Sequence, residues 1–314
     1  MSEPKPLIIL TGSTAVGKTK LSIELAKKIN GSIISADSMQ VYRYMDIGTA
    51  KITKKQMQNV PHYLIDEFDP KDEFHVVRFQ EYAKRYMDEI YSKGSIPILV
   101  GGTGFYIQAV LYDIDFTKVE AQEDYRKELL AFAKEHGEQA LHEKLRKIDP
   151  ISAQSIHPNN VKRVIRALEY YSQTGNPISK HNEVERQKAS PYRFAYFVLT
   201  DDRKILYDRI NQRVDQMIID GLIEEVIHLK ELGYERSLVS MQGLGYKEIY
   251  SYLEGECSLE EAIEQIKCST RHFAKRQLTW FKREKDVIWL DRTKLGEDSI
   301  ILEQMLRNIK NILK

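Results

Sequence analysis

The chain has 314 residues, 42% of them hydrophobic, and its 47 Lys and Arg residues almost balance 46 Asp and Glu residues, for a net charge of +1. This composition excludes an intrinsically disordered chain, which needs low hydrophobicity and high net charge. The length suggests one or two domains. A near-neutral total argues at first against a nucleic-acid-binding protein, although a total can hide segments of opposite charge.

Cysteine usage and hydropathy point to a reducing, aqueous compartment. Cys257 and Cys268 are too few for a disulfide framework or a four-ligand zinc site, and the eight histidines show no metal-ligand spacing. The apolar run at residues 7–10 is far shorter than the core of a signal peptide, and no run approaches the ~18 apolar residues of a membrane span. We therefore expect a cytoplasmic protein with no membrane association.

Short apolar runs with β-strand chemistry recur along the chain, and most are continuous, as in strands covered on both faces. These runs are residues 7–10, 32–35, 96–100, 194–199 and 287–290. Amphipathic helices are predicted at 18–30, stopped by Gly31, at 76–93, stopped by Gly94, and after the fourth run up to Gly221. Strands alternating with helices predict an α/β fold with a parallel sheet flanked by helices.

The middle of the sequence differs from both ends. From about residue 120 to residue 189 the strand signal disappears and charged, helix-favouring residues dominate. We expect an inserted all-helical subdomain, 120–189, in a core formed by residues 1–119 and 190–314. Residues 115–122 and 188–191 would form its boundaries.

The strongest local motif is Gly12-Ser-Thr-Ala-Val-Gly-Lys-Thr19, which matches GxxxxGK[ST] between a predicted strand and a predicted helix. In such a phosphate loop the glycines let backbone N–H groups turn toward phosphate oxygens at a helix N-terminus. Lys18 would reach the outer phosphate, and the Thr19 hydroxyl could bind Mg²⁺. The motif predicts binding of a di- or triphosphate and does not specify the reaction.

Two polar residues follow other predicted strands. ATPases and GTPases place an acidic Mg²⁺ partner after a later apolar strand, but here the 96–100 run ends in Gly101-Gly-Thr-Gly104. The carboxylate follows the 32–35 run instead, as Asp37. Because strand ends line the ligand crevice of an open α/β sheet, we expect Asp37 and Thr103 to face the phosphates. Asp37 could bind magnesium, act as a general base or only cap a turn, and Thr103 could be a simple loop residue.

Several motifs together resemble the tRNA dimethylallyltransferases, also called isopentenyl-tRNA transferases. They occur in order over roughly residues 7–285: GSTAVGKT (12–19), DSMQVY (37–42), GTAK (48–51), PHYLID (61–66), GGTGFY (101–106), RVIRALEYYSQTG (163–175), QRVDQM (212–217), GLGYKE (243–248) and TRHFAKRQLTWFKR (270–283). Ser13 and Asn160 depart from the commoner residues of the family, a proline and an acidic residue. The absence of a cysteine/histidine zinc finger before Lys314 favours the bacterial type.

The resemblance implies transfer of a dimethylallyl group from dimethylallyl diphosphate to N6 of the adenine 3′ of the tRNA anticodon, with a Mg²⁺ requirement. Gly12, Ser13, Thr14, Ala15, Val16, Gly17, Lys18 and Thr19 would hold the diphosphate. Lys18 and Arg213 would neutralise the leaving group, Asp37 would accept the N6 proton, and Thr103 would help to position the diphosphate. By spacing alone, Arg213 is an ordinary solvated helix residue.

The same resemblance implies a set of tRNA contacts. The adenine must leave the anticodon-loop stack to be modified, so base contacts are expected from Asp37, Ser38, Met39 and Gln40. Other expected tRNA contacts are Asn160, Arg163, Arg166, Gln242, Gly243, Tyr246, Arg271, Lys275, Arg276 and Gln277. Tyr42 and Tyr106 could stack on the base or belong to the core. The enzyme is expected to work as a monomer.

Two other functions account for part of the sequence. A small-molecule P-loop kinase explains the phosphate loop, Asp37 and Arg213, but not the basic segment 270–283. A P-loop protein that only binds nucleic acid or acts as a switch explains the basic segments but leaves Asp37 and Thr103 without a role.

Charge is strongly segregated in the second half of the chain. Residues 158–213 have a net charge of +5 and residues 267–285 a net charge of +6, whereas residues 214–266 have a net charge of −9. Within the second basic segment, Arg271, Lys275 and Lys282 would share one helix face, and Phe273 and Trp280 would pack elsewhere. The near-neutral total therefore does not exclude RNA, and binding should weaken steeply with salt.

Overall fold

The computed structural model describes residues 3–116, 123–310 and 312. It divides the chain into two compact units, Met1–Leu111 with Pro191–Lys314, and Tyr112–Ser190. The expected boundary at 119/120 lies outside the described residues, and the expected boundary at 189/190 lies one residue before Pro191.

The first unit contains a parallel sheet. Its strands are β1 (Pro6–Gly12), β2 (Gly31–Ser35), β3 (His62–Tyr63), β4 (Ile96–Gly101), β5 (Arg193–Thr200) and β6 (Val287–Asp291). They form one sheet among the described residues, in the order β3-β2-β4-β1-β5-β6, and every paired neighbour is parallel. The fold class expected from the sequence is confirmed. The central strand β1 is buried along nearly its whole length, which explains its continuous apolar sequence.

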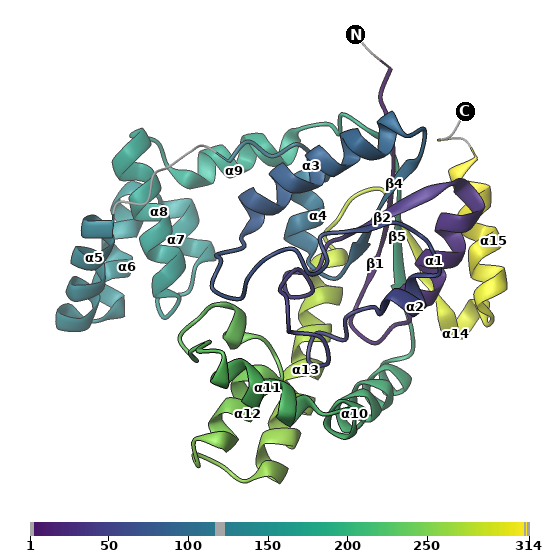
Figure 1. The fold of residues 1–314 in the computed structure, drawn as a ribbon. Helices are drawn as coiled ribbons and strands as arrows, with labels where there is room; N and C mark the ends of the chain where they lie inside the picture. The colour runs from purple at the N-terminus through teal and green to yellow at the C-terminus, as the bar shows by residue number, and fades with distance from the viewer. Residues whose placement is uncertain (1–2, 117–122, 311, 313–314) are drawn as a thin grey trace. The chain divides into compact units, whose positions relative to one another are not determined.

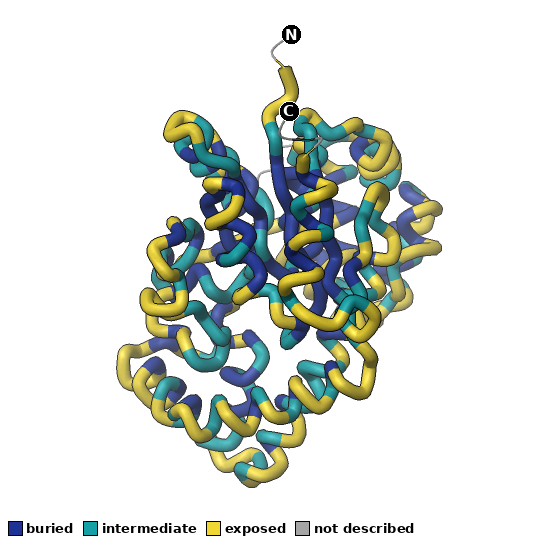
Figure 2. Tube along the Cα trace, turned by 90° about the vertical axis from the view of Figure 1, so that its right-hand side faces the viewer, coloured by how far each residue is buried: buried dark blue, intermediate teal, exposed yellow. Residues whose placement is uncertain are grey.

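Helices cover this sheet and extend from its lower edge, where the strands end (Figure 1). They are α1 (Lys18–Ile29), α2 (Lys54–Met57), α3 (Val76–Ser92), α4 (Gly104–Leu111), α10 (Arg203–Ile219), α11 (Leu222–Glu231), the 3-10 helix η1 (Ser240–Gln242), α12 (Tyr246–Leu253), α13 (Leu259–Phe281), α14 (Arg292–Leu295) and α15 (Asp298–Ile309). One apolar core joins β1 to α1 and α15 through buried residues such as Leu10, Leu25 and Met305. Figure 2 shows the strands as the most continuously buried part of this unit.

One detail of the first helix differs from the sequence prediction. Asn30, with φ of 52°, takes the left-handed position that ends α1, and Gly31 already belongs to β2. A Cβ at Gly31 would lie 2.6 Å from Cδ1 of Ile98 on β4, so a larger residue there would force that side chain to shift. Gly94, with φ of 66°, ends α3 as expected.

The second unit is entirely helical in its described residues. It contains α5 (Glu123–His136), α6 (Glu138–Ile148), α7 (Pro150–Ser155), α8 (Val161–Thr174) and α9 (Ile178–Gln187). An apolar cluster that includes Leu129, Leu141 and Val164 forms its core. Arg126 donates two hydrogen bonds of 2.8 Å to the buried carboxylate of Glu169, which ties α5 to α8.

No described helix combines the length and apolar character that crossing a membrane requires.

Candidate active site

The phosphate loop Gly12–Thr19 connects β1 to α1, as the motif predicts. Gly12 has a φ of 143°, and a Cβ at this position would lie 2.4 Å from the carbonyl oxygen of Leu199 on β5. Only glycine fits both the conformation and the close approach. Gly17, with φ of 92°, directly precedes α1, so the loop leads into a helix N-terminus that can accept an anion.

Two side chains show that this loop suits a phosphate group. The Lys18 ammonium donates to the carbonyl oxygens of Gly12 at 3.1 Å and Ser13 at 2.8 Å, so it lies over the loop. Among the described residues, the fully buried Ser13 hydroxyl has no hydrogen-bond partner. A buried hydroxyl without a partner costs free energy unless a ligand supplies one. A phosphate oxygen fits that requirement.

Lys18, Asp37 and Arg213 form one electrostatic group. Burial lowers the pKa of Lys18 to about 8, the Asp37 carboxylate opposes this shift, and the Arg213 guanidinium adds to it. Burial also lowers the pKa of Arg213, and Asp37 again opposes the shift. Two cations and one carboxylate, contributed by α1, the loop after β2 and α10, therefore interact at the phosphate loop.

Hydrogen bonds beyond the strand ends hold the three loops of the site together. The N–H of Ala36 donates to the carbonyl oxygen of Val100 at 2.8 Å, and the N–H of Thr103 donates to that of Ala36 at 3.1 Å. The Thr11 hydroxyl donates to the carbonyl oxygen of Gly101 at 2.7 Å. The ladder thus continues past β2 and β4, so the loops that carry Asp37 and Thr103 lie beside the phosphate loop.

The Asp37 carboxylate is oriented by its own loop. Its Oδ1 accepts hydrogen bonds from the N–H groups of Met39 at 2.9 Å and Gln40 at 3.4 Å. Ser38 and Met39 are half-buried. The Gln40 amide is engaged within the protein: its Oε1 accepts from the Ser35 hydroxyl at 3.1 Å, and its Nε2 donates to the carbonyl oxygens of residues 49 and 50. Gln40 therefore braces the loop rather than presenting its amide to a base.

Gln277 has a different position from the one expected. We predicted that it contacts tRNA, but it is 6% exposed and lies between two loops. Its Oε1 accepts from the N–H of Thr14 at 2.9 Å, and its Nε2 donates to the carbonyl oxygen of Gly102 at 3.0 Å. A Cβ on Gly102 would lie 2.1 Å from that Nε2. Gln277 thus links the phosphate loop to the loop of Thr103.

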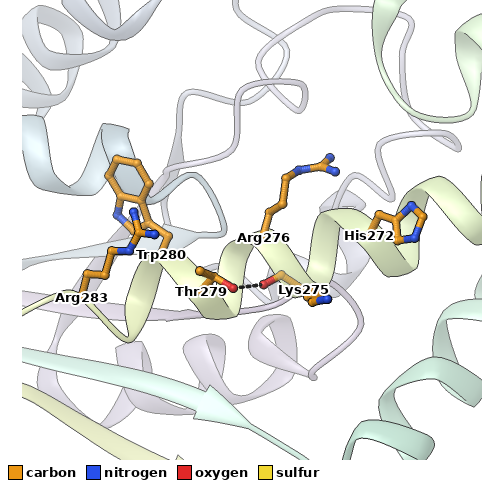
Figure 3. Close-up of a pocket in the computed structure, with 6 residues that line it drawn as sticks. All are labelled: His272, Lys275, Arg276, Thr279, Trp280 and Arg283. Carbon is orange, nitrogen blue, oxygen red and sulfur yellow. Dashed lines mark hydrogen bonds between the residues drawn. The ribbon is translucent and has the colours of Figure 1, made fainter. Parts of the chain in front are cut away.

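Trp280 and a row of basic residues line an open groove on α13, with a volume of about 380 Å³. Its lining residues are His272, Lys275, Arg276, Thr279, Trp280 and Arg283. Figure 3 shows Arg276 and Trp280 extending to the same side of the helix, one turn apart. The groove follows two neighbouring rows with i, i+4 spacing, one from His272 to Trp280 and one from Lys275 to Arg283.

This groove corrects the predicted basic face. Arg271 is half-buried and turned toward α10, where it donates to Oδ1 of Asn211 at 2.6 Å, so it is not part of the groove. Trp280 lies beside the cations instead of packing away from them. A Cβ on Gly104 would lie 2.3 Å from Cδ1 of Trp280, and the Phe105 and Trp280 rings meet edge to face at 6.1 Å.

The expected contact of tRNA with Tyr246 is also corrected. Tyr246 is fully buried, and its hydroxyl donates to Oε1 of Glu225 at 2.6 Å. Neighbouring Gly243 is buried, with its Cβ position 2.5 Å from Cε of Met39, and Gln242 is exposed. Tyr42 and Tyr106, at 1% and 6% exposure, are core residues.

Three expected tRNA contacts belong to the helical unit. Arg163 and Arg166 are exposed on α8, and exposed Asn160 caps this helix by accepting from the N–H of Arg163 at 3.4 Å. An arginine pair on an exposed helix face can bind phosphate groups. The structure leaves these three residues as a prediction.

The sequence reading missed Arg292, the first residue of α14. Its Nη1 lies 3.3 Å from the Cβ position of Gly17, and its Nη2 pairs with Asp298 at 2.5 Å. A single arginine after an edge strand has no sequence signature. His272, Trp280 and Arg283 were also missed as groove residues, although their i, i+4 spacing with Arg276 and Thr279 was visible in the sequence.

Diphosphate binding should weaken above about pH 8. As the pH rises through the pKa of Lys18, about 8, the unliganded protein loses one positive charge. A bound anion raises that pKa, so the dissociation constant should rise by roughly one log unit per pH unit above it. Calorimetric titration of the protein with inorganic diphosphate at neutral pH and at about pH 9.5 measures this effect. The Lys18→Ala variant should bind diphosphate more weakly, and its dissociation constant should no longer begin to rise near pH 8. A rise that persists above pH 8 in this variant would contradict the assignment of the effect to Lys18.

The chain is similar to known proteins over nearly its whole length. The family model described as IPP transferase matches residues 40–284. A protein of Lachnoclostridium phytofermentans named tRNA dimethylallyltransferase is 64% identical over 99% of this chain and 100% of its own length. A crystal structure of the full-length tRNA isopentenylpyrophosphate transferase of Bacillus halodurans has 49% identity and a TM-score of 0.75, covering 99% of this chain and 97% of that one. A eukaryotic dimethylallyltransferase acting on tRNA has 31% identity and a TM-score of 0.82, covering 98% of this chain and 79% of that one. The chain belongs to the IPP transferase family, the tRNA dimethylallyltransferases.

Proposed function

We propose that the protein transfers a dimethylallyl group from dimethylallyl diphosphate to N6 of the adenine 3′ of the anticodon in tRNA and releases diphosphate. Membership of the family makes it a prenyltransferase that modifies tRNA. The observation that carries the finer proposal is the placement of Lys18, Asp37 and Arg213 in one electrostatic group at a phosphate loop. We further propose that it works as a monomer in the cytoplasm, where its tRNA substrate is found.

The phosphate loop would stabilise the diphosphate leaving group. As the allylic C–O bond breaks, its electron pair passes to the diphosphate oxygen and negative charge grows there. Preorganised N–H donors and cations at that position lower the barrier. Backbone N–H groups of the loop, Lys18 and Arg213 supply them, and the Thr103 hydroxyl would position the diphosphate near the reacting carbon.

Asp37 provides for the nucleophile. The adenine N6 forms the new bond to the allylic carbon and gives up a proton, which the carboxylate accepts. The two hydrogen bonds to Oδ1 fix this carboxylate in place, and Oδ2 accepts no hydrogen bond from the described residues. A base inside a stacked anticodon loop is inaccessible to such a group, so the adenine must be extruded. Ser38 and Met39 lie on the same loop and are proposed to contact the extruded base.

The residues present also fit a magnesium ion bound together with the substrate. Among the described residues no group of three or more His, Cys, Asp or Glu could form a metal site. Mg²⁺ typically uses one or two protein oxygens together with substrate phosphates. Thr19 is exposed in the first turn of α1, beside the phosphate position, and would hold the ion, which would neutralise charge on the diphosphate.

A transfer assay tests the proposed function directly. The protein would be incubated with labelled dimethylallyl diphosphate, Mg²⁺ and unmodified tRNA, and the RNA would be examined for label. We expect label at the adenine 3′ of the anticodon and stoichiometric release of diphosphate. No label in the RNA, together with ATP-dependent phosphorylation of a small metabolite, would favour the small-molecule kinase, which the family membership does not favour.

Binding of tRNA should fall steeply with salt in spite of the net charge of +1. The groove on α13 presents Lys275, Arg276 and Arg283, and each phosphate contact contributes about 0.7 to 0.9 to the slope of log affinity against log salt. The double variant Lys275→Gln, Arg276→Gln should therefore bind more weakly and with a shallower slope. Filter binding of tRNA across a salt series measures both quantities. Lys28 is exposed in the last turn of α1, and Lys28→Gln is the matched control. An equal loss of slope in that variant would refute the assignment of the α13 groove as a tRNA-binding surface.

A further inference from the structure

One carboxylate outside the proposed reaction has an unusually complete set of hydrogen bonds. Glu225, on α11, accepts from the N–H groups of Asp46 at 2.9 Å, Ile47 at 2.7 Å and Gly48 at 3.1 Å. It also accepts from the hydroxyl of Tyr246 on α12 at 2.6 Å. Four donors match the lone pairs that a carboxylate offers. Successive backbone N–H groups that converge on one anion form a strong, directional clamp.

The turn formed by residues 46–48, whose N–H groups Glu225 binds, supports the loop of Asp37. The carbonyl oxygens of Thr49 and Ala50, directly after the turn, accept from Nε2 of Gln40 at 3.4 Å. The N–H of Gln40 in turn donates to Oδ1 of Asp37 at 3.4 Å. Hydrogen bonds joined by the short backbone segment 46–50 therefore connect Glu225 to the proposed general base.

Packing supports the same connection. A Cβ on Gly48 would lie 2.5 Å from the ring of Tyr246, so the turn lies directly against that ring. The side chain of Met39, two residues after Asp37, lies against Gly243 at the start of the loop that leads to Tyr246. An ion pair also holds the turn: the Lys51 side chain, 3% exposed, pairs with Asp46 at 2.6 Å.

We propose that Glu225 is a positioning residue, which holds residues 37–40 in the geometry that proton transfer and base contact require. This inference rests on the proposed role of Asp37. It also gives Tyr246 a function in place of the RNA contact, since its hydroxyl and ring complete the clamp. The carboxylate takes no part in the reaction itself, because its four hydrogen bonds all lie within the protein.

The test compares Glu225→Gln with Glu224→Gln. The amide keeps the size of the side chain but replaces an acceptor oxygen with an N–H donor, which faces at least one N–H of the turn. We expect the single-turnover transfer rate at saturating tRNA and donor to fall about tenfold or more, because small displacements of reacting groups are costly. The dissociation constant of inorganic diphosphate should stay within about twofold, since the phosphate loop is untouched. Glu224 is exposed on the same helix, and its variant should match the unmodified protein in both measurements.

Two further variants separate positioning from simple loss of stability. Val226, next to Glu225 on α11, is fully buried, and Val226→Ala removes two of its methyl groups. This variant should therefore have a lower melting temperature and an unchanged transfer rate. Tyr246→Phe removes one donor of the clamp, and adding it to Glu225→Gln should lower the rate by less than the product of the two single effects. A transfer rate within twofold of the unmodified protein in Glu225→Gln would overturn the proposal, as would an equal loss of rate in Val226→Ala.

Hydrogen exchange distinguishes failure of this inference from failure of the proposed function. In Glu225→Gln the amides of Met39 and Gln40 should exchange faster, whether or not the protein prenylates tRNA. Unchanged exchange in residues 38–41 would overturn the coupling even if transfer were confirmed. The unmodified protein could transfer no label while hydrogen exchange in residues 38–41 is still faster in Glu225→Gln. In that case the proposed function fails, and the connection from Glu225 to the Asp37 loop stands.

Discussion

Replacing Asp37 with asparagine is expected to lower the single-turnover rate of transfer by about 10²- to 10⁴-fold, the usual contribution of a general base. Asparagine keeps an oxygen that can accept from the N–H groups of Met39 and Gln40, so the loop should keep its conformation. The amide cannot take the N6 proton. Rapid-quench measurement with labelled donor and saturating tRNA reports the chemical step, and filter binding should show tRNA affinity largely retained.

The control for this prediction is Asp208→Asn, an exposed carboxylate on α10, which should leave the rate unchanged. Normal turnover on bound tRNA combined with lost tRNA affinity in Asp37→Asn would contradict the role of Asp37 as the base. It would instead assign Asp37 to recognition of the adenine.

Replacing Lys18 with alanine is expected to have a comparably large effect, but on the donor side of the reaction. The ammonium lies over the phosphate loop, donating to the carbonyl oxygens of Gly12 and Ser13. Removing one charged donor from a developing anion typically costs about 10²- to 10³-fold in rate. Because the same cation also holds the ground-state diphosphate, we expect the KM for dimethylallyl diphosphate to rise as well.

Lys20→Ala is the matched control for Lys18→Ala, since Lys20 lies on the same helix with 72% of its side chain exposed. Steady-state kinetics with varied donor and fixed tRNA should leave the Lys20 variant close to the unmodified protein. An unchanged KM and an unchanged turnover in Lys18→Ala would refute the phosphate-loop assignment.

The parts of this fold and site that the sequence predicted are those that local chemistry determines. The apolar runs identified β1, β2, β4, β5 and β6. Burial on both faces explains the continuous apolar sequence of the central strand β1, whereas the edge strand β6 is only partly buried, with Trp289 37% exposed. The proximity of Asp37 and Thr103 to the phosphate loop followed from one rule, that parallel strands all end at the same edge of the sheet.

The parts that the sequence did not predict depend on tertiary contacts. Gln277 and Arg271 lie in a basic helical segment, and only the packing of α13 decides that one braces two loops and the other contacts Asn211. Tyr246 belongs to one of the motifs by which the sequence resembles the family, but membership of a motif does not distinguish a contact with substrate from a buried hydroxyl. The two-residue strand β3 is too short to produce a recognisable alternation of apolar and polar residues.

The bond between the N–H of Thr14 and Oε1 of Gln277 joins residues 263 positions apart in the chain. During synthesis Gln277 emerges 263 residues after Thr14, and contacts of such long range form late in folding. Residues 112–190, by contrast, form a contiguous unit that leaves the ribosome before β5. Nascent chains that stop short of α13 therefore carry a phosphate-loop sequence without its brace, so the braced loop can form only after α13 has been synthesised.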